Sequence, residues 1–293
     1  MPEDILLDPE FLRKLDYLSV VAKRIFTGRL KGEKRSKKRG ASVEFADFRN
    51  YSEGDDLRYV DWNTYARLER LFLKLFVEEE DLYVHILIDT SKSMGFGTPT
   101  KLDYTKKIAA ALGYIALTNY DRVLLSSFSD GVASFPMTLR GRDSVFQLFQ
   151  YLRGLKPDGG TNFAGAFRDY AMRTRRTGVA FILSDFLTPR WEDGLKSIVY
   201  RQFQTAIAHV LAPEEVNPDL IGDLRLLDSE TGEERDVSMS LPLMHEYKRT
   251  LDKFQTEVRG ACHRYGADYF FTTTDKPFED LILHTLRAAE VVK

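Results

Sequence analysis

The stretch YVHILIDTSKSMG, residues 83–95, decides the fold of this 293-residue chain. It begins with an apolar, β-rich run and continues into a short polar loop whose first residue is an aspartate. Apolar β-rich runs of this kind recur toward the C-terminus, at residues 83–89, 122–128, 179–185, 205–211 and 268–273. Helical stretches separate them. Strands that alternate with helices predict a mostly parallel sheet that is covered on both faces.

Helical spacing of apolar residues marks the segments between the strands. Helices are predicted at residues 102–119, 143–155, 163–174, 191–200, 242–265 and 278–288. The helix at 242–265 carries an apolar stripe along its length. We interpret this stripe as packing on the sheet rather than as a coiled coil, because it lasts for only three heptads.

Two hairpins interrupt the alternation. Asp130 and Gly131 form a pair that favours a tight type I′ turn, so residues 132–135 are predicted to run antiparallel at an edge of the sheet. A second hairpin is predicted over residues 224–237, with its turn near Gly232.

The first part of the chain, residues 1–81, is expected to be an extension that precedes a domain of residues 82–293. Residues 8–26 show helical spacing, and residues 70–78 alternate as a strand does. The charges of the intervening segment 54–67 are interpreted as pairing with one another to brace a loop, and a binding surface is the alternative.

A strongly basic segment lies within this extension. Residues 23–39 hold nine Lys or Arg side chains and one acid, Glu33. A phosphate-binding arm that contacts nucleic acid is one interpretation. The segment contains several glycines, however, and residues 28–40 offer no aromatic side chain on which a base could stack. A solvated loop is therefore favoured over nucleic-acid binding.

The composition is that of an ordinary globular protein. Lys and Arg total 42 and Asp and Glu total 44, and this net charge of −2 creates no overall field that would attract nucleic acid or an anionic membrane. Cys262 is the only cysteine, which excludes an intrachain disulfide and a cysteine-cluster metal site. The chain also lacks an apolar run of about 20 residues and an N-terminal signal pattern. We therefore expect a cytoplasmic protein without a membrane span.

Three loops carry short side chains that end in oxygen: DTSKSMG at 89–95, DGGTN at 158–162 and SDF at 184–186. Ligands of open α/β sheets bind at the carboxyl ends of the strands, where these loops are expected to meet. Asp89, Ser91 and Ser93 alternate, so an extended loop would point all three in one direction. Thr161 would approach from the second loop and Asp185 from the third.

These two carboxylates and three hydroxyls form a hard-oxygen set that suits Mg²⁺ or Mn²⁺ rather than zinc. Hydroxyl ligands bring no negative charge, so the ion would stay electrophilic and could accept a carboxylate from a partner protein at an open position. The sequence thus predicts a metal-dependent protein-interaction site.

This constellation resembles the metal-ion-dependent adhesion site of von Willebrand factor A domains. The matching residues are Asp89, Ser91 and Ser93 in the first motif, Thr161 in the second and Asp185 in the third. The resemblance covers about residues 82–293 and implies a doubly wound, mostly parallel six-stranded α/β sheet of order 3-2-1-4-5-6 with strand 3 antiparallel. Phe186 stands where the family often has Gly, a departure that concerns the shape of the loop rather than the ligands.

The segment FADFRNYSEGDDLRYVDWNTYAR, residues 45–67, and the LFLKLF strand after it are similar to the signature of the bacterial family called domain of unknown function 58. The stretch DSETGEE before the long helix is similar to that family too. Members commonly occur with MoxR-type AAA+ ATPases. The resemblance therefore implies a partner-binding role in an ATPase-driven, chaperone-like system.

Catalysis by this chain is not expected. Phosphotransfer enzymes of the haloacid dehalogenase type also place an Asp after the first parallel strand, but they need a second Asp where this chain has Ser91. The sequence contains neither a G-x-S-x-G elbow nor a G-x-x-x-x-G-K-S/T phosphate loop. A Mg²⁺-dependent phosphotransfer enzyme is the less favoured alternative to a binding protein.

Overall fold

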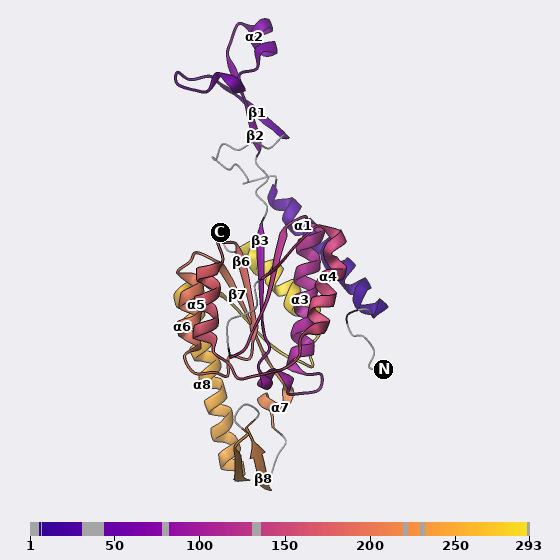
Figure 1. Ribbon diagram of the computed structural model, residues 1–293, viewed down its shortest axis with the longest axis vertical. Coiled ribbons are helices and arrows are strands. Elements are labelled where there is room, and N and C mark those ends of the chain that lie inside the picture. The colour runs from indigo at the N-terminus through magenta and orange to yellow at the C-terminus, as the bar shows by residue number, and fades with distance from the viewer. Residues whose placement is uncertain are drawn as a thin grey trace. The chain divides into compact units, whose positions relative to one another are not determined.

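The computed structural model describes Leu6 and residues 8–30, 44–77, 82–130, 136–218, 222–228 and 232–291 (Figure 1). The chain forms two compact units, of which the larger comprises Met1–Ile25 with Leu82–Lys293 and the smaller comprises Phe26–Asp81. Most of the basic segment at 23–39, from residue 31 onward, lies outside the described residues.

A six-stranded sheet forms the centre of the larger unit. Its strands in spatial order are β10 (Asp268–Thr273), β7 (Gln204–Leu211), β6 (Val179–Ser184), β3 (Tyr83–Asp89), β4 (Arg122–Phe128) and β5 (Met137–Arg140). Neighbouring strands pair in parallel, except that β4 and β5 are antiparallel. Numbered within the unit, this order is 3-2-1-4-5-6 with strand 3 antiparallel, so the predicted topology is confirmed.

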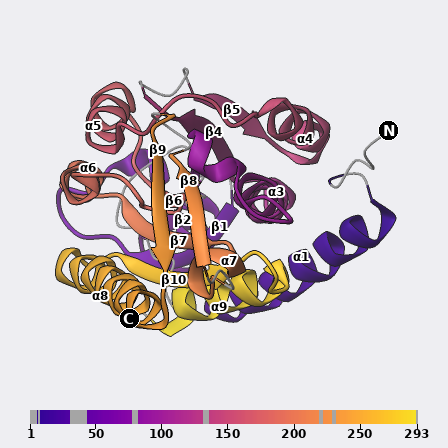
Figure 2. The same ribbon diagram turned by 90° about the horizontal axis from the view of Figure 1, so that it is seen from below.

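Helices cover both faces of this sheet, which makes the fold a doubly wound α/β fold (Figure 2). On one face, α5 (Phe163–Arg173) and α6 (Trp191–Val199) pack together with part of α8 (Leu241–Tyr265). The other face carries α3 (Lys101–Thr118), α4 (Val145–Gly154) and α9 (Phe278–Val291). Short helical turns follow β3, β5 and β7, namely η2 (Lys92–Gly95), η3 (Arg142–Ser144) and α7 (Pro213–Val216).

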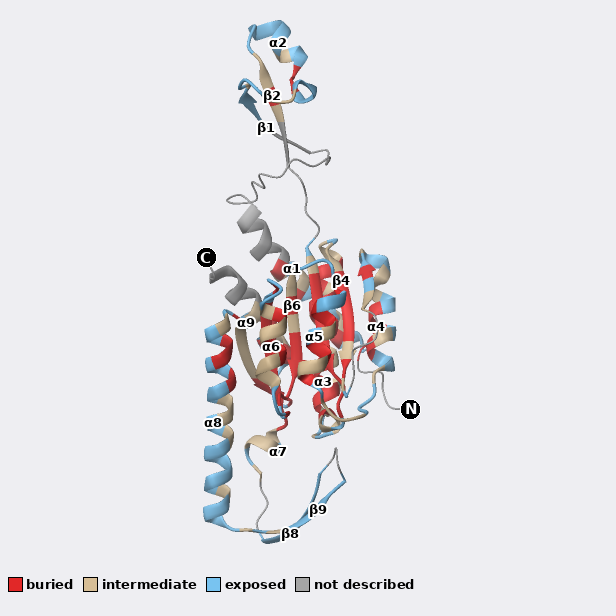
Figure 3. Ribbon diagram, turned by 60° about the vertical axis from the view of Figure 1, so that its left-hand side comes forward, coloured by how far each residue is buried: buried red, intermediate tan, exposed pale blue. Residues whose placement is uncertain are grey.

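The core lies between the sheet and these helices, where Figure 3 shows the buried residues. The ring centroid of Phe163 lies 4.1 Å from that of Phe167 and 5.4 Å from that of Phe128. Such edge-to-face pairs stabilise a fold by about 0.5–1.5 kcal/mol beyond the burial of their area. His85, inside β3, is fully buried and its Nδ1 lies 2.8 Å from the hydroxyl of Tyr170. It is a core residue with a polar partner.

The edge strand is antiparallel, as predicted, but it lies further along the chain. Residues 132–135, where it was expected, lie outside the described residues. The strand that pairs with β4 is Met137–Arg140, in a register that places Met137 opposite Leu125 and Arg140 opposite Arg122. The described edge strand thus begins two residues after the predicted one ends.

The first helix belongs to the larger unit, which differs from the expected extension of residues 1–81. Helix α1 (Pro9–Leu30) buries one apolar stripe, made of Phe11, Leu15, Leu18 and Ala22. The ring of Phe11 lies 5.3 Å from that of Phe278, and Nζ of Lys14 lies 2.8 Å from Oε1 of Glu279. These contacts tie α1 to α9. The smaller unit, which includes the last residues of α1, is therefore an insertion into the larger unit.

The smaller unit is a two-stranded sheet with a short helical connection. Its elements are β1 (Glu44–Asn50), η1 (Leu57–Tyr59), α2 (Trp62–Leu68) and β2 (Phe72–Val77). The strands pair antiparallel from Glu44 opposite Val77 to Asn50 opposite Phe72. Strand β1 was not predicted, because its residues EFADFRN mix charged and aromatic side chains without a clear apolar face.

Charged side chains hold this connection in place. Asp55 accepts a hydrogen bond of 2.8 Å from Arg49, and Asp61 caps α2 by accepting from the backbone N of Asn63 at 3.0 Å. The predicted pairing of charges within segment 54–67 is confirmed for Asp56 and Arg58, whose Oδ2 and Nη2 lie 2.7 Å apart. Asp55 and Asp61 also brace the connection, but through Arg49 and through a backbone N–H group. The apolar side chains of α2 are not buried with them, since Trp62 is 57% exposed.

The second hairpin has the expected position. Its strands are β8 (Gly222–Leu227) and β9 (Glu234–Met239), which form a separate two-stranded sheet before α8. The packing expected for α8 holds for only part of the helix. Val258 and Ala261 of the stripe are buried, whereas Tyr247, nearer the start of the helix, is exposed. The interpretation of the whole stripe as sheet packing was therefore wrong for the first half of α8, which extends past the end of the sheet.

Candidate functional site

The first candidate loop follows β3 directly. Asp89 ends the strand and is fully buried, and its Oδ1 accepts a hydrogen bond of 2.9 Å from the backbone N of Ser91. The loop is extended only as far as Ser91, which caps η2, and Ser93 lies inside that turn. The expected extended alternation therefore stops at Ser91. The turn nevertheless keeps the Oγ atoms of Ser91 and Ser93 3.1 Å apart.

Backbone hydrogen bonds attach the second loop to the first. The N of Asp158 donates to the carbonyl of Thr90 at 2.8 Å, and the N of Lys92 donates to the carbonyl of Gly159 at 3.0 Å. Gly159 has a φ of +73°, and a Cβ there would lie 2.8 Å from Oδ2 of Asp130. The positive φ is what favours glycine here, since a Cβ would displace only the end of the Asp130 side chain.

The third loop supplies Asp185 immediately after β6. Oδ2 of Asp185 accepts a hydrogen bond of 2.8 Å from Oγ of Ser93. Ser184, the last residue of β6, donates its hydroxyl to Oδ2 of Asp89 at 2.6 Å. Neighbouring strand ends thus meet through side chains, as the parallel arrangement of β3 and β6 predicts.

Four of the five predicted residues are joined in this way, namely Asp89, Ser91, Ser93 and Asp185. Thr161 lies on the second loop, and its backbone carbonyl accepts a hydrogen bond of 3.1 Å from Thr188, just after the third loop. The structure therefore places Thr161 on a loop fastened to both of the others.

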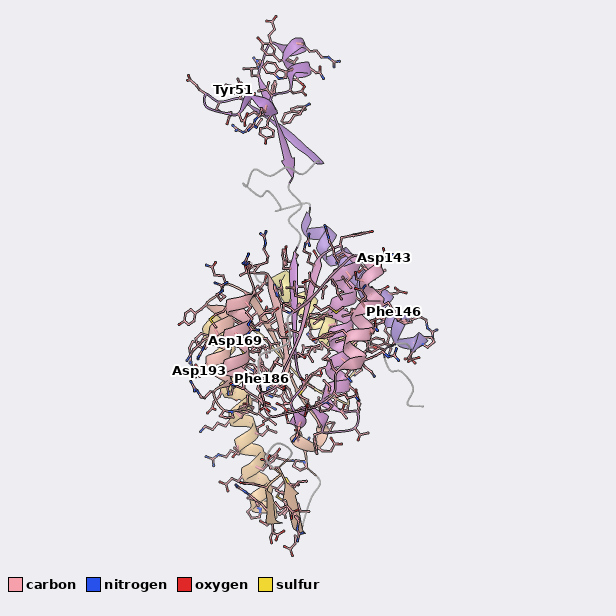
Figure 4. The ribbon with its side chains drawn as sticks, in the orientation of Figure 1. Tyr51, Asp143, Phe146, Asp169, Phe186 and Asp193 are labelled. Carbon is pink, nitrogen blue, oxygen red and sulfur yellow. The ribbon has the colours of Figure 1, made fainter. Side chains whose placement is uncertain are left out.

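Phe186 keeps the backbone shape that glycine would favour. Its φ is +58°, in the left-handed region, and its side chain is fully buried. The ring centroid lies 5.1 Å from that of Phe163 and 5.6 Å from that of His209 (Figure 4). Packing of the ring thus offsets a backbone conformation that costs a non-glycine residue about 1–2 kcal/mol.

Two charged residues that the sequence did not indicate complete the site. Lys101, the first residue of α3, is fully buried, and its Nζ lies 2.8 Å from Oδ2 of Asp185 and 2.5 Å from Oε1 of Glu215. Glu215 belongs to α7, after β7, and its Oε2 accepts from the backbone N of Ala212 at 2.7 Å. A lysine in the first turn of a helix opposes the helix dipole. That unfavourable placement of Lys101 was the one feature of the sequence that could have pointed to these two residues.

The site is strongly anionic for a buried cluster. Burial raises the pKa of Asp89 to about 7, and the nearby charge of Asp185 adds to this rise. Burial also raises the pKa of Glu215, although the Lys101 ammonium opposes the effect. Among the side chains joined here, three are carboxylates and one is an ammonium group. When all are ionised, two negative charges are left without a cation.

The oxygen spacing fits a hard divalent ion. A cation with six ligands at about 2.1 Å holds neighbouring ligands about 3 Å apart. Ser91 Oγ and Ser93 Oγ are 3.1 Å apart, and Ser93 Oγ and Asp185 Oδ2 are 2.8 Å apart. Among the described residues, no three His, Cys, Asp or Glu side chains gather closely enough to hold a metal by themselves. A metal in this place would therefore depend on the serine and threonine oxygens.

Comparisons with known proteins give relatives along nearly the whole chain. An uncharacterised protein of Mycobacterium tuberculosis is 28% identical over 276 residues, which cover 92% of this chain and 86% of that protein. An uncharacterised protein of Mycobacterium avium is 34% identical over 103 residues, 35% of this chain and 60% of that protein.

Solved structures similar to this chain include the conserved hypothetical protein BatB from Bacteroides thetaiotaomicron, with 14% identity and a TM-score of 0.45 over 72% of this chain and 100% of that one. They also include the SpRpn10 VWA domain, with 15% identity and a TM-score of 0.38 over 70% of this chain and 95% of that one.

None of the described helices combines the length and the apolar character that crossing a membrane requires.

The family described as "Protein of unknown function DUF58" matches residues 47–257, which include most of the smaller unit, all three site loops and the β8–β9 hairpin. The chain belongs to this family.

Proposed function

We propose that this chain is a metal-dependent protein-interaction module. A divalent cation, Mg²⁺ or Mn²⁺, binds the oxygens of Asp89, Ser91, Ser93, Thr161 and Asp185, and an acidic side chain of a partner protein completes its coordination. The observation that carries this proposal is the chain of contacts from Asp89 to Asp185 through the two serines, whose oxygens have the spacing of metal ligands.

The charge of the site supports a cation that still attracts an external acid. Three of the five ligands are neutral hydroxyls, so they leave most of the positive charge of the ion to be neutralised by carboxylates. Asp185 already shares its charge with the Lys101 ammonium. A carboxylate from outside is therefore a favourable further ligand.

The same donor set argues for binding rather than for catalysis. It holds neither an imidazole nor a thiolate, and Ser91 occupies the position where phosphotransfer would need a second acid. We therefore propose that this chain is not itself an enzyme.

The partner that the family resemblance implies is a MoxR-type AAA+ ATPase, with this chain as the binding half of a chaperone-like system. We place this role in the cytoplasm, because the one cysteine, Cys262, is a buried free thiol, which suits a reducing compartment.

Calorimetric titration of the chelator-treated protein with Mg²⁺ tests the metal site. Wild type is expected to bind, and Asp89→Ala is expected to lose at least about tenfold in affinity. Asp143→Ala is the matched control, because Asp143 is exposed and follows β5 at the amino ends of the parallel strands (Figure 4). Equal Mg²⁺ affinity in wild type and Asp89→Ala would refute the proposal.

Affinity capture from the native cell tests the partner. Retention of an AAA+ protein in the presence of Mg²⁺, with release by a chelator, is the expected result. Retention that is equal with and without the chelator contradicts a metal-dependent interaction.

A further inference from the structure

The apolar stripe of α8 continues past the sheet on which its second half packs. In that second half, the ring of Phe254 lies 5.8 Å from His209 in β7, and Val258 is fully buried. The same stripe runs toward the start of the helix through Leu251, Tyr247, Met244 and Leu243. Leu243 and Tyr247 are each 37% exposed. The apolar face with which α8 packs on the sheet thus continues along the helix beyond the end of the sheet.

A hydrogen bond fixes the direction of this face. The hydroxyl of Tyr247 donates to the backbone carbonyl of Glu215 at 2.6 Å. Glu215 in turn lies 2.5 Å from Lys101, which contacts Asp185. The exposed part of the stripe therefore lies at the end of the sheet that carries the candidate metal site.

The β8–β9 hairpin adds a second apolar face at the same end. Residues directly opposite each other in an antiparallel pair lie on one face, and Leu224 is opposite Val237 while Gly222 is opposite Met239. Leu226, two residues after Leu224, shares that face and is 42% exposed. Figures 1 and 3 both show the hairpin beyond the end of the sheet where α7 lies. Isolated two-stranded hairpins are at best marginally stable in water.

We propose that these two faces form a docking surface for a partner segment in which an Asp or Glu is flanked by apolar side chains. The surface comprises Leu224, Leu226, Val237 and Met239 of the hairpin with Leu243, Met244, Tyr247 and Leu251 of α8. The inference rests on the proposed function, since the metal selects the acid, and it adds that apolar side chains beside the acid supply affinity and specificity.

Fluorescence anisotropy with synthetic peptide pools tests this surface. The first pool has a central Glu with Leu, Ile, Val, Phe or Met on both sides. The second keeps Glu but has Ser and Gly as flanks, and the third keeps the apolar flanks but replaces Glu with Gln. In Mg²⁺ the first pool is expected to bind at least about tenfold more tightly than either of the others. Equal binding of the first two pools, or no binding of the first, overturns the proposal.

Two adjacent leucines provide a matched pair of variants. Leu226 lies on the apolar face, whereas Leu227, opposite Glu234, lies on the other face and is 66% exposed. Leu226→Ser and Leu243→Ser are expected to reduce binding of the first pool to that of the second, and Leu227→Ser is expected to leave it unchanged. Similar losses in Leu226→Ser and Leu227→Ser overturn the docking surface.

The chelator separates the two proposals. Loss of Glu selectivity in Asp89→Ala and in chelator, with the Leu226 effect retained, is expected if both are correct. If binding depends on Leu226 but not on Mg²⁺ or on the central Glu, the metal-dependent function fails and the stated acid-containing partner is overturned with it. If Mg²⁺ binds and Glu is required but Leu226→Ser has no effect, only the docking surface fails.

Discussion

Nζ of Lys101 lies 2.8 Å from Oδ2 of Asp185, and the two side chains are 0% and 3% exposed. The same ammonium lies 2.5 Å from Oε1 of Glu215 in α7. One buried cation therefore pairs with two carboxylates from different parts of the chain. Truncation of one partner of a buried ion pair leaves a charge without compensation, and this typically costs about 3–5 kcal/mol.

Lys101→Met is therefore expected to lower the free energy of unfolding by about 3–5 kcal/mol in chelator. Lys101→Met combined with Glu215→Gln is expected to lose less, because one of the two stranded anions is removed as well. Lys196→Met is a control, since its pairing with Glu192 is at the surface and should contribute little to stability. Urea denaturation measures all three. Equal stability of the single and double variants would show that the ion pair is not what holds this cluster.

Phe186 lies in a left-handed backbone conformation with its ring in the core. Phe186→Gly should relieve about 1–2 kcal/mol of backbone strain but lose about 3–5 kcal/mol of packing, a net loss of about 1–4 kcal/mol. Phe186→Leu should lose less than the glycine variant, because it retains part of the packing. Thermal or urea unfolding measures the order of stability of wild type and the two variants. A glycine variant as stable as wild type would mean that strain outweighs packing at this loop.

His85 predicts a loss of stability in acid. Burial lowers its pKa to about 4, whereas an unfolded chain binds the proton near pH 6.5. Between these values the unfolded state binds more protons at this residue than the folded state, so the contribution of His85 to stability falls by up to about 3 kcal/mol as pH decreases from about 6.5 to 4. His209 has its pKa lowered to about 4 by burial too and adds to the same loss.

The measurement for this prediction compares the free energy of unfolding at neutral and at acid pH. His85→Gln is expected to lose less stability over that range than wild type does. His245→Gln, at an exposed position on α8, serves as a control and should leave the pH dependence unchanged. Asp89, whose pKa burial raises to about 7, takes up a proton in the folded state over the same range and opposes this loss in both proteins. The test is therefore the difference between wild type and His85→Gln, and an equal pH dependence of the two would contradict the assignment of His85 as a neutral core residue.

Asp61 and Trp62 are neighbours with different expected effects. Asp61 caps α2 and also accepts from the hydroxyl of Thr64 at 3.0 Å, so Asp61→Ala should destabilise the helix by about 1 kcal/mol. Trp62→Ser should cost no more than about 0.5 kcal/mol, because the side chain is largely exposed. Hydrogen exchange of the amides of α2 should therefore accelerate several-fold in the first variant and little in the second. The reverse order would show that the indole is buried in solution.

The strands of the large sheet were predictable because each one is an apolar β-rich run between polar segments. Residues 83–89, 122–128 and 268–273 form strands with the predicted bounds. Strand β1 could not be predicted, since a strand of a small exposed sheet needs no apolar pattern. Strand β5 lies further along the chain than predicted, because the connection from β4 is longer than the two-residue turn that Asp130-Gly131 favours.

The candidate site was predictable as far as local motifs extend. Asp89, Ser91 and Ser93 share one loop, and Asp185 follows a neighbouring strand, so the fold alone brings them together. Lys101 and Glu215 come from α3 and α7 and meet only because both elements pack at the same end of the sheet. No sequence motif indicates that these two residues are in contact.

The insertion of the smaller unit also affects how the protein is made. Helix α1 contacts Phe278 and Glu279 of α9, which lie far from it in the sequence. During synthesis, therefore, α1 emerges from the ribosome long before α9, which it contacts. Phe11, in the apolar stripe of α1, therefore cannot reach its neighbour Phe278 until α9 has been translated.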